Sequence, residues 1–87
     1  MKYKILKDYI IQDYEDNKII FDPDTSEVTI LNNSAWIIFS SIRDKSVEDI
    51  IELLAQYYPS EKDEVLKNDV LETVDQLREL GLIFYDE

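Results

Sequence analysis

"VTILNNSAWIIF", residues 28–39, places an extended segment directly before a helical one, and this junction decides the fold. Its first four residues are apolar or β-branched, a composition typical of a strand. After "NNS", apolar residues recur at helical spacing, namely at Ala35, Ile38, Phe39 and Ile42. Asn32 or Asn33 is suited to cap that helix. The junction therefore predicts a short strand that runs into a helix with almost no loop.

Two further runs of isoleucine and aromatic residues precede the junction, "YIIQDY" (9–14) and "KIIFD" (18–22). The polar "EDN" between them indicates a hairpin. "DPDTSE" (22–27) is dense in turn formers, because Pro23 fixes its own φ and aspartate side chains bond nearby amides. Three strands joined by two short turns predict an antiparallel meander.

Two more helices are expected after the junction. Ser46 with Asp49 three residues later resembles a capping box. An apolar stripe follows it, made of Val47, Ile50, Ile51 and Leu54. Pro59 ends this helix, and Ser60 is expected to cap a third one. The third stripe is Leu66, Val70, Val74 and Leu77, before Gly81 and an extended "LIFY" (82–85). Strands followed by helices predict an α+β fold, with a three-stranded antiparallel sheet and then three helices.

The composition limits the chemistry that the chain can perform. Its 87 residues predict a single domain, 1–87. It has no His, no Cys and one Gly. These absences remove the common nucleophile pairs, imidazole or thiolate ligands for metals, and a glycine-rich phosphate loop. We therefore expect no enzyme, no catalytic residue, no metal site and no cofactor.

The charge of the chain bears on its partners. Nine basic residues against twenty acidic ones give a formal net charge of −11. Nucleic acids and anionic membranes attract basic proteins, so we expect neither as a partner. The acidity either serves solubility or attracts a basic partner, and both readings stay open. No apolar run approaches a membrane span, and "MKYKILKDYI" is too polar for a signal peptide, so we expect a cytoplasmic protein.

Three features other than the strand offer candidate sites, each with a plainer reading. "DPDTSE" resembles the start of a calcium loop, but Glu27 and Asn33 stand where that loop needs Gly and Glu, which favours a turn. Trp36 could stack on a ligand, but its place near an apolar stripe favours the core. Asp69 borders the stripe of the third helix, where it serves either a salt bridge or solvation, or else binding.

The main candidate is "VTIL", Val28, Thr29, Ile30 and Leu31. A three-stranded meander has two edge strands, and proteins usually protect such edges with charge. The first strand carries that protection, with charges at Asp8, Asp13 and Glu15 and the polar Gln12, whereas "VTIL" has no charge. Either "LIFY" or a helix covers this edge, or an extended peptide adds to it as a fourth strand. We favour the added peptide.

Three segments together resemble the PqqD family of small peptide chaperones, also called RiPP recognition elements: "TILNNSAWIIFSSI", "SVEDIIELLAQYY" and "KNDVLETVDQLRELGLI". The similarity spans about residues 18–83 and rests on the order and spacing of core and cap residues. Its positions are Leu31, Asn32, Ser34, Ala35, Val47 to Tyr58, Asp69, Val70, Val74, Leu77, Gly81 and Leu82. Thr73 departs from it, since the family often has an aromatic residue there. "SSIRDKS" also lacks the usual glycine.

The resemblance implies a winged-helix-like fold and a partner, the leader of a ribosomally made precursor peptide. The leader would bind as a strand on "VTIL", in the cleft beside the third helix, which adds Leu66, Asp69, Val70 and Thr73 to the expected site. The resemblance also implies delivery to a modifying enzyme, either a radical SAM enzyme or cyclase and protease machinery. It leaves open the product, the leader sequence and the enzyme.

Two other classes of protein fit the sequence less well. A winged-helix DNA-binding regulator shares the architecture, but its recognition helix needs basic residues, and the third helix has only Lys62, Lys67 and Arg78 among many acids. A small carboxylate- or metal-dependent enzyme is disfavoured by the missing His and Cys.

Overall fold

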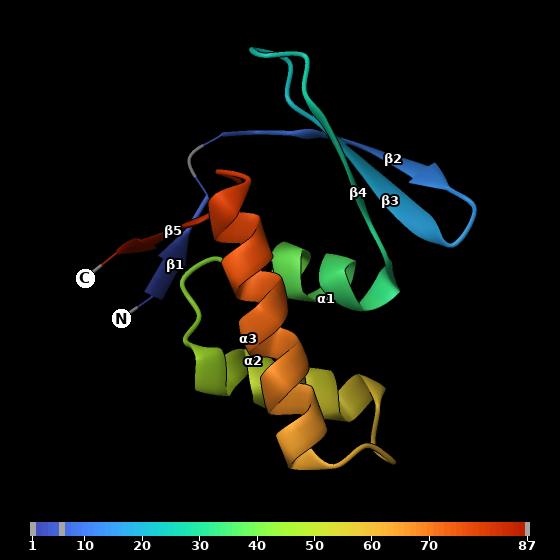
Figure 1. Ribbon diagram of the computed structural model, residues 1–87, viewed down its shortest axis with the longest axis vertical. Helices are drawn as coiled ribbons and strands as arrows, with labels where there is room; N and C mark the ends of the chain where they lie inside the picture. The colour runs from blue at the N-terminus through green and yellow to red at the C-terminus, as the bar shows by residue number, and fades with distance from the viewer. Residues whose placement is uncertain (1, 6, 87) are drawn as a thin grey trace.

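The computed structural model describes residues 2–5 and 7–86, in two small sheets and three helices (Figure 1). The elements in chain order are β1 (Lys2–Lys4), β2 (Ile10–Tyr14), β3 (Asn17–Phe21), β4 (Val28–Leu31), α1 (Asn33–Ser41), α2 (Val47–Tyr57), α3 (Asp63–Glu79) and β5 (Phe84–Asp86). The α+β fold, with a three-stranded antiparallel sheet followed by three helices, is confirmed. None of the helices in the described ranges is long and apolar enough to cross a membrane.

The larger sheet has the order β2-β3-β4, with both pairs antiparallel. β2 and β3 form the expected hairpin, whose two-residue turn lies between the paired residues Tyr14 and Asn17. Within the turn Glu15 has a φ of 55°, a left-handed conformation that tight hairpin turns require. The third strand, "VTIL", spans the residues that the sequence predicted.

The helix starts show where local signals decide structure. The side chain of Asn32 accepts a hydrogen bond from the Ala35 N–H at 2.9 Å, so β4 passes into α1 through this cap. Ser46 and Asp49 form the predicted capping box at the start of α2. The prediction that Ser60 caps the third helix is wrong. The Glu61 N–H donates to the Tyr58 carbonyl at 3.1 Å in a turn around Pro59, and α3 begins only at Asp63.

The core lies between the inner face of the larger sheet and the helices. Its residues come from every helix and from both sheets: Tyr3, Ile20, Leu31, Ile37, Ile38, Phe39, Ile42, Ile50, Leu54, Leu66, Val70, Val74, Leu77, Leu82 and Ile83. Trp36 is partly buried and packs against this core, as expected, with its ring 6.3 Å from that of Phe39. Lys18 lies over the Trp36 ring, 5.4 Å from its centroid.

β1 and β5 pair in a second, two-stranded sheet, which the sequence did not predict. "LIFY" was expected to be extended, and part of it is, but β5 pairs with β1 and does not cover β4. The rings of Tyr3 and Tyr85 stack at 4.5 Å between the two strands. Figure 1 shows β1 and β5 side by side here, away from the larger sheet.

Candidate functional site

β4 is an edge strand of the larger sheet, because among the described residues its only strand partner is β3. Its β-branched residues favour an extended backbone, and the Asn32 cap ends the strand at the start of α1. Val28 and Ile30 are exposed, Thr29 is half-buried and Leu31 is buried in the core. The strand thus has one side anchored in the molecule and an uncharged open edge.

The phase of the β3–β4 ladder determines which backbone groups of β4 face that edge. The Asp22 N–H donates to the Glu27 carbonyl at 3.0 Å, and this pair continues the register that opposes Phe21 to Val28 and Ile20 to Thr29. Hydrogen-bonded and non-bonded pairs alternate in an antiparallel ladder. The backbone of Thr29 therefore faces β3. The N–H and C=O groups on either side of it, at Val28 and Ile30, point to the open edge.

A cavity of about 200 Å³ adjoins the inner side of β4. It is lined by residues from the segment before β2, from β3 and β4, from the loop between these two strands and from the turn after α3: Lys7, Tyr9, Ile20, Asp22, Thr25, Glu27, Thr29, Leu80, Gly81 and Leu82. Leu80 is 53% exposed, although it is a large apolar side chain. Gly81 has a φ of 76°, which lets the chain turn sharply beside the cavity. β4 and the carboxyl end of α3 therefore share one concave region.

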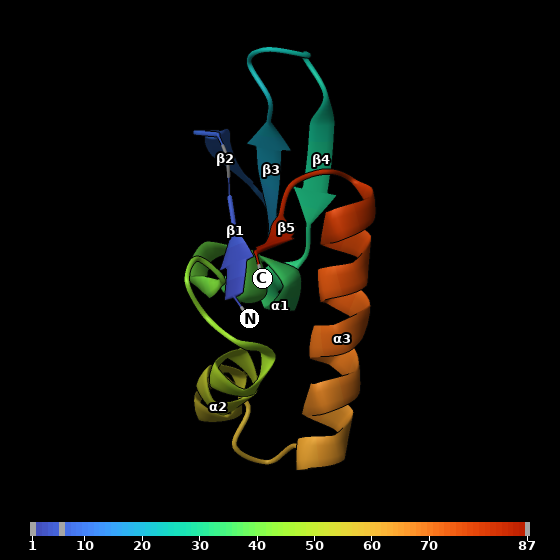
Figure 2. The ribbon, with the colours of Figure 1, turned by 90° about the vertical axis from the view of Figure 1, so that its left-hand side faces the viewer.

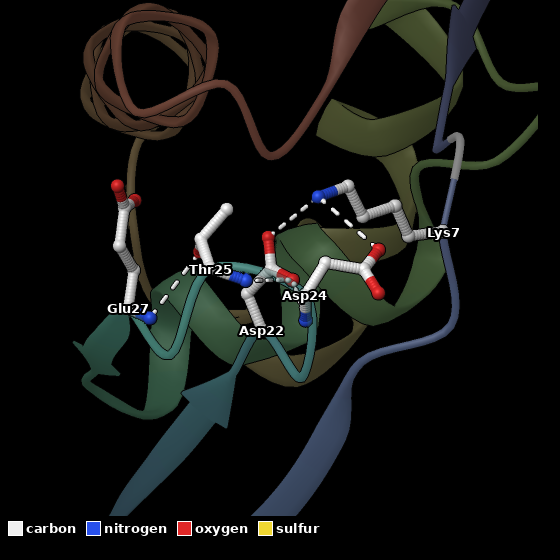
Figure 3. Close-up of polar contacts among 5 residues, drawn as sticks. All are labelled: Lys7, Asp22, Asp24, Thr25 and Glu27. Carbon is white, nitrogen blue, oxygen red and sulfur yellow. Dashed lines mark hydrogen bonds and ion pairs between the residues drawn. The ribbon is translucent and has the colours of Figure 1, made fainter.

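The loop before β4 is held by a polar network (Figure 3). Lys7 Nζ donates to Asp22 Oδ2 at 2.7 Å, and Asp24 lies 3.7 Å from the same nitrogen. The other Asp22 oxygen accepts from the main-chain N–H of Asp24 at 2.9 Å and of Thr25 at 3.4 Å. The hydrogen bond from Lys7 lowers the pKa of Asp22, and it raises the pKa of Lys7. This network fixes the loop at one wall of the cavity.

The site residues expected on the third helix are placed differently from those on β4. Leu66 and Val70 are 2% and 0% exposed and belong to the core. Asp69 is exposed and Thr73 is half-buried. None of the four lines the cavity beside β4. Figure 2 shows why: the amino-terminal half of α3 lies beside α2, and its carboxyl end reaches the level of β4.

Sequence reasoning missed three contributors to this region, Leu80, Tyr9 and the Lys7–Asp22 pair. A signal for Leu80 was present, since it follows Leu77 by three residues and continues the stripe of α3. Lys7 carried no such signal, because its partner lies fifteen residues away across a turn.

A larger cavity, of about 570 Å³, lies on another part of the surface, between α3 and β5. Its lining is Asp75, Arg78, Glu79, Ile83, Phe84 and Tyr85, and β4 does not contribute to it. The smaller cavity is the better candidate site, because it adjoins an open strand edge that can hold a peptide backbone.

Comparisons with known proteins agree with this fold. TbiB1, solved in complex with the TbiA(beta) leader peptide, is similar over 95% of this chain and 99% of its own, with a TM-score of 0.76 and 19% identity. A lasso peptide synthetase B1, solved with its leader peptide, is similar over 98% of this chain and 100% of its own, with a TM-score of 0.78 and 19% identity. No curated protein matches the chain significantly. The family model described as "Coenzyme PQQ synthesis protein D (PqqD)" matches residues 17–83, most of the chain. The chain therefore belongs to the PqqD family.

Proposed function

We propose that this protein is a peptide chaperone that binds the leader of a ribosomally made precursor peptide and presents it to a modifying enzyme. The leader adds to β4 as a fourth strand. The observation that carries the proposal is the uncharged open edge of β4, with the backbone groups of Val28 and Ile30 directed outward. Membership of the PqqD family and two relatives of the same fold solved with leader peptides support it.

Backbone pairing and the adjoining cavity contribute differently to recognition of the leader. An added strand gains main-chain hydrogen bonds whatever its sequence, so the ladder supplies affinity. Side chains of the leader that point to the inner side enter the cavity beside Thr29 and Leu80, so the cavity supplies selectivity. Asp69 and Thr73 lie further along α3 and would contact a leader that extends past β4.

The protein acts by binding alone, in the cytoplasm, and the modifying enzyme performs the chemistry. This part of the proposal rests on the absence of His and Cys and on the single Gly of the sequence. A DNA-binding role is disfavoured by the net charge of −11, which repels a polyanion. The enzyme is either a radical SAM enzyme or cyclase and protease machinery, as in the family that the sequence resembles.

The test is binding of synthetic leader peptides, taken from short open reading frames that neighbour the gene, followed by amide hydrogen exchange. We expect a Kd between about 1 nM and tens of μM. The Val28 and Ile30 amides should exchange fast in the free protein and slowly in the complex, whereas Thr29 should be protected in both. The proposal fails if no leader binds, or if protection on binding appears elsewhere and not in β4.

A further inference from the structure

The larger sheet has an outer face without a charged side chain. The strand register and the alternation of side chains along each strand place the following residues on this face: Ile10, Gln12, Tyr14, Asn17, Ile19, Phe21, Val28 and Ile30. α1 packs under the opposite, inner face, where Ile20 and Leu31 are buried. An uncharged, largely apolar face on a protein with a net charge of −11 indicates a surface that another chain contacts.

Two rows of side chains cross this face and end at β4. One row consists of Ile10, Phe21 and Val28. The other consists of Gln12, Ile19 and Ile30. Ile19 and Phe21 have a strand on each side and are half-buried. Val28 and Ile30 are 57% and 59% exposed, because in the described chain no strand lies beyond them. The rows are therefore open at the edge where the proposed leader strand adds.

We infer that the leader is recognised on both faces of the sheet, through a short continuous apolar run; this inference rests on the proposed function. Side chains of an added strand alternate between the two faces. One set enters the cavity beside Thr29 and Leu80. The other set extends the two open rows, so two leader residues separated by one contact Val28 and Ile30. Polar leader residues at these two positions would leave the apolar side chains of Val28 and Ile30 uncovered.

The leader fits this face better than a second copy of the protein does. Two copies, each with a charge of −11, repel one another as their faces approach. The open rows are also continuous with the β4 edge, so one extended peptide fills both without a further interface.

Two matched double variants test the inference. Val28→Ser with Ile30→Ser removes the apolar side chains at the β4 end of the rows. Ile10→Ser with Tyr14→Ser removes side chains of similar exposure, 54% and 55%, from the opposite edge of the same face. The probe is a peptide selected on the parent protein from a phage-displayed random library. Two cross-strand pairs contribute about two- to thirtyfold in affinity, so the β4 variant should lose that factor and the β2 variant should bind as the parent does.

Aspartate scanning of the selected peptide gives an independent readout. Recognition on both faces predicts loss of affinity at consecutive positions, whereas recognition by the cavity alone predicts loss at every second position. Thermal melts of both double variants check that each remains folded, as substitutions at exposed positions normally do.

The outcomes separate this inference from the proposed function. If peptides bind, and the β4 serine variant binds them as the parent does, the inference is wrong and the proposed function stands. Equal losses in both variants contradict it as well, since they indicate a partner that covers the whole face. If no peptide binds the parent, the proposed function fails and the inference fails with it.

Discussion

The main-chain N–H of Asp22 lies 3.0 Å from the carbonyl oxygen of Glu27, and this bond sets the phase of the ladder between β3 and β4. The tight hairpin between β2 and β3 gives the same phase, because a two-residue turn makes Tyr14 and Asn17 a hydrogen-bonded pair. Alternation then assigns the backbone of Thr29 to β3 and that of Ile30 to the open edge.

This phase predicts opposite effects of proline at neighbouring positions. Thr29→Pro removes an N–H that faces β3, so the small domain should unfold or melt much earlier. Ile30→Pro removes an N–H at the open edge, where proline is tolerated, so the fold should survive. The leader loses one donor, and an unmade buried bond costs about 1–3 kcal/mol, so affinity should fall roughly five- to hundredfold. Thermal melts and leader titrations measure both effects.

Ile30→Ser is the control for this pair, because it shortens the side chain and keeps the N–H. Ile30→Pro should bind the leader more weakly than Ile30→Ser does. Two folded proline variants that both bind like the parent would show that β4 is not the docking edge.

The cavity makes a second prediction, at Leu80. A leader side chain that enters the cavity would cover the exposed half of Leu80. Full burial of a leucine contributes about 1.5–3 kcal/mol, so half of that corresponds to roughly three- to twelvefold in affinity. Leu80→Ser should therefore weaken leader binding by this factor. Leu71→Ser, at a 40% exposed leucine of α3 outside the cavity, should leave binding unchanged, and equal effects would contradict the assignment.

The parts of the fold that sequence could predict are those set by local signals. β4 follows from β-branched residues, and the starts of α1 and α2 follow from the caps at Asn32 and Ser46. Ser60 carried the same kind of signal, but it lies within the turn that the Glu61 N–H closes onto the Tyr58 carbonyl, and α3 begins only at Asp63. The pairing of β1 with β5 joins strands of three residues from opposite ends of the chain, which no local pattern specifies.

The candidate site also has a part that local sequence signals predict and a part that they do not. The edge was predictable because β4 lacks charge. The helical stripe marked Leu66 and Val70, but apolar periodicity reports burial, and both side chains lie in the core at 2% and 0% exposure. The cavity depends on where the turn after α3 meets the loop before β4, which is a tertiary relationship.

Acid should weaken the loop before β4 through Asp22. The hydrogen bond from Lys7 lowers the folded-state pKa of this carboxyl, so the folded protein binds fewer protons there than the unfolded chain. Its contribution to stability is present above the ordinary pKa of about 4 and is lost as the pH falls through the folded value. Asp22→Asn should therefore lower Tm at neutral pH, and the difference from the parent should shrink below about pH 4. Glu72→Gln, an equal charge change at an exposed position of α3, is the control for the loss of one negative charge at neutral pH.

The junction between β4 and α1 predicts a stability effect at Asn32. Its side chain satisfies the Ala35 N–H at the start of the helix. Loss of such a cap costs about 1 kcal/mol, so Asn32→Ala should lower the free energy of unfolding by about that amount in urea titrations. Asn32→Ser keeps a capping oxygen and should restore most of the loss. Equal destabilisation by serine and alanine would show that the cap does not stabilise this junction.

The net charge of −11 makes the last prediction, which concerns the rate of leader binding. If acidity steers the partner, leaders with Lys or Arg should associate faster than neutral ones, because opposite charges raise the encounter rate. Added salt screens this attraction over about 10 Å at 0.1 M, so it should slow association much more than it speeds release. Stopped-flow measurements over a salt series give both rates, and a peptide with its basic residues replaced by Gln is the control. Association that is independent of salt for the basic peptide would leave the complex in place and assign the acidity to solubility.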